Sequence, residues 1–81
     1  MTSDIIIPDT WENPSLSLSE DELTLVGIDG NAGSIMSHVS RILKQTGNPR
    51  EVVDAWRREA MSGDYDHLLH AALVYLGAEL V

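Results

Sequence analysis

Three stretches in the later part of the chain place apolar side chains at intervals of three and four residues, the spacing of one face of an α-helix. The pattern predicts helices over residues 32–46, 49–61 and 65–80. Because only a few residues separate these segments, the helices should pack as sequential neighbours. The chain is therefore predicted to be mainly α, with a short N-terminal strand or arm followed by a three-helix bundle.

Capping signals mark the boundaries of the first and third predicted helices. Asn31 or Asp29 can accept a hydrogen bond from the free amides at the start of the first helix. Gly47 follows that helix, where a left-handed backbone conformation is favoured. Asp64 stands where it can cap the third helix.

The second helix carries a longer signature at its start. Asn48 is the predicted cap, Pro49 suits the first helical position, and Glu51 stands three residues beyond the cap, as in a capping box. Trp56 lies in the middle of the apolar face and is predicted to be a core residue. The face as a whole comprises Val52, Val53, Trp56, Ala60 and Met61.

The third helix is apolar almost all round, because Val74 and Tyr75 widen a stripe that already contains several leucines up to Leu80. Such a helix is either central to its bundle or covered by a second chain. A chain of 81 residues without cysteine has no disulfide to stabilise it and only a small core. We therefore expect a homo-oligomer.

The first part of the chain has a different character. Residues 1–20 are predicted to form an acidic flexible arm, ahead of a small helical domain over residues 21–81. Ile5–Ile7 and Trp11 are apolar enough to dock onto the body or onto a neighbouring chain. The segment ELTLVGI at residues 22–28 predicts a short strand, with a buried helical turn as the alternative.

The net charge of −8 is unevenly distributed. Residues 1–30 contain seven acidic and no basic side chains, whereas residues 31–81 contain six acidic and five basic ones. This acidity argues against nonspecific nucleic-acid binding but leaves room for an anion site in the nearly neutral second part. We find no targeting segment, and the longest apolar run has about half of the ~20 residues that a membrane span needs. The default expectation is a cytoplasmic protein without membrane partners.

The string GIDGNAGS at residues 27–34 places glycines at the start of a helix, where free amides can bind an anion. It lacks the spacing of a P-loop, and a purely structural turn that caps the helix is the alternative. Basic side chains on the first two helices can supply charge, and Tyr65 and His67 can contact a base or ribose. The predicted ligand-binding residues are Gly30, Asn31, Ala32, Gly33, Ser34, Arg41, Lys44, Arg57, Arg58, Tyr65 and His67.

Polar residues at the start of the third helix suggest two other kinds of chemistry. Asp66, His67 and His70 have the spacing of metal ligands, but a third ligand would have to come from His38 or elsewhere. A carboxylate beside a histidine can also move a proton, yet no nucleophile accompanies the pair. We therefore predict no metal, no cofactor and no catalytic residues, and expect a binding protein rather than an enzyme.

Residues 25–76 resemble a family of small, mostly uncharacterised bacteriophage and prophage proteins. The matching strings are GIDGNAGSIMSHVSRILKQTG and EAMSGDYDHLLHAALVYL, which carry Gly-x-Asp-Gly-Asn and Ser-Gly-Asp-Tyr-Asp-His-Leu-Leu motifs. Gly33 departs from the family pattern, which often has a large apolar residue there. The resemblance implies a phage-encoded binding protein in the bacterial cytoplasm that counters host defence by sequestering a nucleotide-type immune signal. The alternative is an inhibitor or adaptor of a host defence protein, which would use the acidic arm and the apolar third helix.

Overall fold

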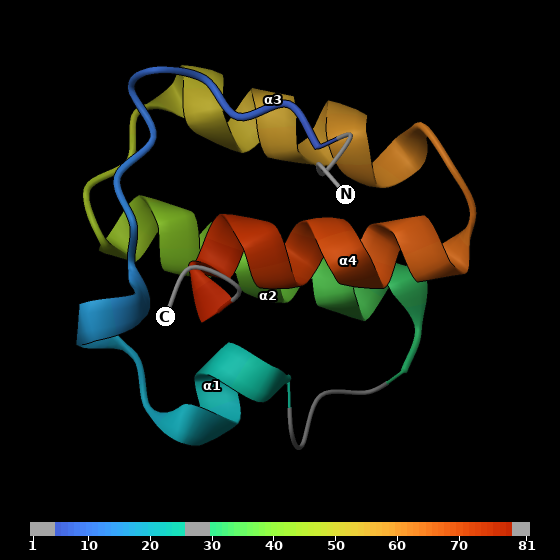
Figure 1. The fold of residues 1–81 in the computed structure, drawn as a ribbon, viewed down its shortest axis with the longest axis horizontal. Helices are drawn as coiled ribbons and strands as arrows, with labels where there is room; N and C mark the ends of the chain where they lie inside the picture. The colour runs from blue at the N-terminus through green and yellow to red at the C-terminus, as the bar shows by residue number, and fades with distance from the viewer. Residues whose placement is uncertain (1–4, 26–29, 79–81) are drawn as a thin grey trace.

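The computed structural model describes residues 5–25 and 30–78 of the chain. Within them, a short 3-10 helix and four α-helices follow one another, and no strand is present (Figure 1). The mainly helical architecture is confirmed. The elements are η1 (Ser15–Ser17), α1 (Glu20–Thr24), α2 (Ala32–Gln45), α3 (Arg50–Met61) and α4 (Tyr65–Leu76).

Helices α2, α3 and α4 pack against one another around a single core, with α1 contacting α4. Trp56 of α3 and Tyr75 of α4 lie at its centre, fully buried, with their rings 5.7 Å apart and tilted by 57°. The Trp56 indole also donates to the backbone oxygen of Met36 on α2, at 3.3 Å. Trp56 is therefore a core residue, as predicted, and its contacts with Tyr75 and Met36 connect the three helices. Met61, assigned to the same apolar face, is instead 73% exposed at the end of α3.

Several helix ends follow their local sequence signals. The Asn31 side chain caps α2 by accepting from the Gly33 amide at 2.8 Å, and Asp64 caps α4 by accepting from the His67 amide at 2.9 Å. Gly47 has a φ of 88°, as expected for the residue after a helix. The α2 helix ends at Gln45, one residue earlier than predicted.

The predicted cap of the second helix is wrong. Pro49 is the N-cap of α3 and makes no side-chain capping hydrogen bond, so the box with Glu51 does not form. The side chain of Asn48 is buried and bonds instead to the backbone of Glu12, with its Oδ1 accepting at 2.7 Å and its Nδ2 donating at 3.0 Å. The Asn48 side chain therefore makes a tertiary contact instead of a helix cap.

The strand predicted over residues 22–28 is also wrong for residues 22–25, and residues 26–28 lie outside the described part of the chain. Ser19 and Glu22 form a capping box that starts α1: the Glu22 amide donates to Ser19 Oγ at 3.3 Å, and the Ser19 amide donates to Glu22 Oε1 at 2.9 Å. Hydrogen bonds from Ser19 lower the pKa of Glu22. The C-cap residue that follows α1 is Leu25, whose φ of 62° is left-handed.

The N-terminal arm, residues 5–14, runs across α3 and down the side of the bundle (Figure 1). The indole of Trp11 donates to the Tyr75 backbone oxygen at 3.0 Å, and the Tyr75 hydroxyl donates to the Ile6 backbone oxygen at 2.5 Å. Ile5, Ile7 and Trp11 also pack against the core. The arm and the other helices therefore cover the unusually apolar α4 within one chain, and this feature does not by itself require a second chain. Leu80 lies outside the described residues.

Candidate functional site

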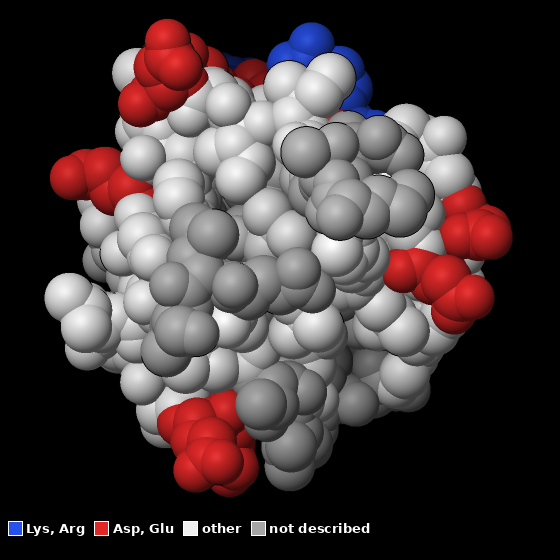
Figure 2. Space-filling view, in the orientation of Figure 1, with Lys and Arg blue, Asp and Glu red and all other residues white. Residues whose placement is uncertain are grey.

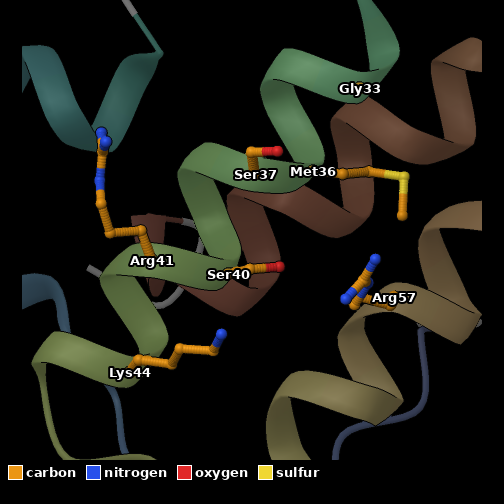
Figure 3. Close-up of a pocket in the computed structure, with 7 residues that line it drawn as sticks. All are labelled: Gly33, Met36, Ser37, Ser40, Arg41, Lys44 and Arg57. Atoms are coloured by element: carbon orange, nitrogen blue, oxygen red, sulfur yellow. The ribbon is translucent and has the colours of Figure 1, made fainter.

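A groove between α2 and α3 contains a hollow of about 460 Å³ (Figure 3). Among the predicted ligand-binding residues, Gly33, Arg41, Lys44 and Arg57 border this hollow. Sequence reasoning did not select the other lining residues for the site. These are Met36, Ser37 and Ser40.

The side chains in the groove come from two consecutive helices, α2 and α3. Lys44 of α2 and Arg57 of α3 extend into the gap between the helices, and the hydroxyls of Ser37 and Ser40 point to the same side (Figure 3). The guanidinium of Arg41 is directed away from this gap, toward α1 (Figure 3). Lys44 and Arg57 are therefore the two cations that face the hollow directly.

A second hollow, of about 420 Å³, adjoins the first and shares Lys44 and Arg57 with it. Arg50 and Asp54 of α3 also border it, and their side chains form an exposed ion pair at 3.7 Å. Arg58, four residues after Asp54, has a suitable spacing to pair with it. Arg50 takes this role on the preceding helical turn, at the equivalent spacing of four residues.

The groove concentrates the positive charge of the molecule. The chain has thirteen acidic and five basic side chains, and four of the five basic ones line the two adjoining hollows. The face in Figure 2 shows acidic side chains near its rim and basic ones at its upper edge. A cleft lined by one sign of charge on a molecule of the opposite sign attracts complementary ligands to that cleft.

The glycine-rich start of α2 is arranged differently from the predicted phosphate cradle. Asn31 occupies the Gly33 amide with its own side chain, so this donor is not available to a ligand. Gly30 is exposed, and its backbone oxygen accepts from the Tyr65 hydroxyl at 2.5 Å. Ala32 is exposed and Ser34 half-buried, and neither borders the described part of the groove. At this turn the structure brings together Gly30 and Tyr65, away from Lys44 and Arg57.

Arg58 and His67 also lie apart from the groove. Arg58 borders another hollow, of about 620 Å³, together with Ile6 and Pro8 of the arm and residues of α3. The Nε2 atom of His67 lies 2.8 Å from Glu59 Oε2 and 3.2 Å from Ser62 Oγ.

The Ser62–His67–Glu59 cluster does not have the geometry of a proton relay. In such a relay, the nucleophile and the carboxylate contact opposite nitrogens of the imidazole, whereas here both contact Nε2. Burial raises the pKa of Glu59, but hydrogen bonds from the Ile6 amide and from His67 outweigh it and lower the pKa overall. Because Glu59 contacts both the Ile6 amide and His67, the cluster connects the arm to the segment between α3 and α4.

His38, considered above as a possible third metal ligand, is buried and only 7% exposed. Neither ring nitrogen has a hydrogen-bond partner among the described residues. Burial lowers the pKa of His38, and the positive charge of Arg41 lowers it further, against an opposing effect of Glu22. A neutral imidazole is therefore favoured at this position.

Part of the signal for this groove is present in the sequence, as a polar stripe along the first predicted helix that includes Ser37, Arg41 and Lys44. Residues 33, 36, 37, 40, 41 and 44 follow one another at helical intervals along one face. Met36 is apolar and lies at a position where helical spacing favours a core residue, and Ser40 carries no charge. Only the tertiary structure shows which face of α3 lies opposite these residues, namely the face that carries Arg57.

Among the described residues, no cluster of three or more histidine, cysteine or acidic side chains has an arrangement that could hold a metal ion. No helix in the described ranges is long and apolar enough to cross a membrane. Comparisons of the chain with protein-family models, with curated proteins and with solved structures gave no match.

Proposed function

We propose that this chain binds a small phosphate-bearing ligand of the nucleotide class in the groove between α2 and α3, and acts by retaining it. The observation that supports this most directly is the placement of four of five basic side chains along two adjoining hollows of a chain with a net charge of −8. Nonspecific polyanion binding would favour a basic surface overall, which this composition does not provide.

The chemistry of the groove suits a phosphoryl group. Arg57 offers a planar set of donors that can bind two oxygens at once, and Lys44 offers a compact charge from the opposite helix. Ser37 and Ser40 add hydroxyl donors on the same side. Because the charged side chains are exposed, they need no rearrangement of the core to meet a ligand.

The biological role that we propose is anti-defence: the protein would be phage-encoded and would sequester a nucleotide-type signal of host immunity. This part rests on the resemblance of residues 25–76 to small phage proteins and on the small size of the chain. Retention of a signal requires affinity and abundance but no turnover. A homo-oligomer, which we also expect, would present several such grooves.

The alternative role is inhibition of a host protein through the arm. The observation that favours it is that Ile6 of the arm and Leu16 of the adjoining η1 are 75% and 99% exposed. Trp11, which was expected to dock onto the body or onto a neighbouring chain, donates a hydrogen bond to the Tyr75 backbone oxygen within the chain. Deletion of residues 1–20 would remove these contacts, so a paired Ile6→Ser and Leu16→Ser variant tests this role with less damage to the fold.

Native mass spectrometry of the purified chain, with and without cyclic dinucleotides and ADP-ribose-type compounds, tests the proposal. We expect a bound nucleotide mass that is lost in the Lys44→Ala/Arg57→Ala variant. Arg58→Ala is the matched control, because it removes a cation from α3 that borders a different hollow. Retention of the ligand by the double variant, or equal loss in the control, would contradict the groove as the site. The same spectra report the number of subunits.

A further inference from the structure

The two adjoining hollows of the groove differ in charge. Among the described residues that line the first hollow there are three cations and no carboxylate. The second hollow shares Lys44 and Arg57 and adds Arg50 and Asp54, which carry opposite charges and form an ion pair. Because Arg41 points away from the gap, the two cations that face the groove, Lys44 and Arg57, are common to both hollows. The hollows differ in that the hydroxyls of Ser37 and Ser40 border the first, whereas the Asp54 carboxylate borders the second.

Asp54 is placed to accept hydrogen bonds from a ligand. The carboxylate lies 3.7 Å from the Arg50 Nε, beyond hydrogen-bonding distance, and the two side chains are 55% and 93% exposed. An exposed pair of this kind contributes little to stability, so its rearrangement around a ligand is easily accommodated. The nearby Asn48 is already bonded to Glu12 and Thr46, which leaves Asp54 as the charged acceptor of this hollow.

We infer that the groove has a defined polarity, with the phosphoryl group of a nucleotide between Ser40, Lys44 and Arg57 and the nucleoside toward Asp54. The Asp54 carboxylate accepts hydrogen bonds from the ribose hydroxyls, and this contact distinguishes a nucleotide from inorganic phosphate. A bare anion gains nothing from Asp54 and is repelled by it. This inference rests on the proposed function and specifies the ligand class of the same site.

Calorimetric titration of the full chain with inorganic phosphate and with adenosine 5′-monophosphate tests the polarity. In Asp54→Asn, we expect the affinity for the nucleotide to fall about tenfold, the effect of losing a hydrogen bond to a charged group. The affinity for phosphate should stay equal or rise, because a negative charge is removed. Glu51→Gln is the matched control: it makes the same change in charge on the same helix, and Glu51 borders neither hollow.

The outcomes separate this inference from the proposed function. If wild type binds phosphate and nucleotide equally well, or if Asp54→Asn leaves the nucleotide affinity unchanged, the polarity is wrong while an anion groove remains. If Glu51→Gln weakens nucleotide binding as much as Asp54→Asn, the effect is one of overall charge and the inference also fails. If wild type binds neither probe, both the inference and the proposed function are overturned. Thermal melting of each variant establishes that it is folded.

Discussion

The side chain of Asn48 pairs with the backbone of Glu12 through two hydrogen bonds, one donated and one accepted, across 36 residues of sequence. The side chain of Asn48 is buried, whereas that of Glu12 is exposed. This pairing fixes the N-terminal arm to the connection between α2 and α3, where a helix cap was expected.

Replacement of Asn48 by alanine should lower the free energy of unfolding by about 2 kcal/mol, because both backbone groups of Glu12 lose their partner in a poorly hydrated setting. Urea denaturation followed by circular dichroism measures the loss. Glu12→Ala is the control: it keeps the two backbone groups, so its stability should stay within about 0.5 kcal/mol of wild type. Equal losses in the two variants would mean that the side chain of Glu12 matters as much as its backbone.

The arm is also held by Trp11 and Tyr75. Burial, with a further contribution from Glu59, raises the pKa of Tyr75 to about 12, and the Tyr75 hydroxyl donates to the Ile6 backbone oxygen. Trp11→Phe and Tyr75→Phe each remove one donor but retain an aromatic ring, and each should lower stability by about 1 kcal/mol. Limited proteolysis should then cleave within residues 5–14 sooner than in wild type. Unchanged cleavage rates in both variants would contradict this anchoring.

Buried His38 should make stability depend on pH. Its pKa is lowered in the folded state from 6.5, so the unfolded chain binds the proton more readily. Stability should therefore be complete above about pH 6.5 and should decline as pH falls from there through the folded-state pKa. The charged groups that act on His38 are Glu22 of α1, which opposes the shift, and Arg41 of α2, which adds to it.

Comparison of wild type with His38→Leu isolates this effect, since the other histidines remain in both proteins. Melting temperatures at pH 7.5 and 5.5 are the measurement. The variant should lose less stability on acidification than wild type does. An identical pH dependence in the two proteins would show that His38 does not titrate differently on folding.

Gly47 and Gly77 both have a left-handed backbone, but only Gly77 lies close to another side chain. Substitutions at these two positions therefore separate the cost of backbone strain from the cost of a tertiary contact. Gly47 has a φ of 88° and no atom within 4 Å of an added Cβ, whereas at Gly77, with a φ of 84°, an added Cβ would overlap the side chain of Asn13. Gly47→Ala should cost about 1 kcal/mol from backbone strain alone. Gly77→Ala should cost about 2 kcal/mol more, because Asn13 must move as well. Chemical denaturation of both variants gives the difference, and equal costs would mean that Asn13 yields freely.

The sequence by itself determined the three longer helices, because their signals are local. Apolar spacing within each helix, the caps at Asn31 and Asp64, and the glycine at 47 all act over a few neighbouring residues. Four of the predicted ligand-binding residues border one groove: Gly33, Arg41 and Lys44 share one helix, and Arg57 stands on the next.

Some residues could take more than one structural role according to the local sequence, and only the tertiary structure decided between these roles. The Asn48 side chain bonds to the backbone of Glu12 instead of capping α3, His38 is buried, and the arm packs against α4. The same holds for the groove, which exists only because Lys44 and Arg57 project from helices that pack side by side. Local propensity fixes where a helix begins and ends, but burial and hydrogen bonding between distant segments set which of its faces remains open to a ligand.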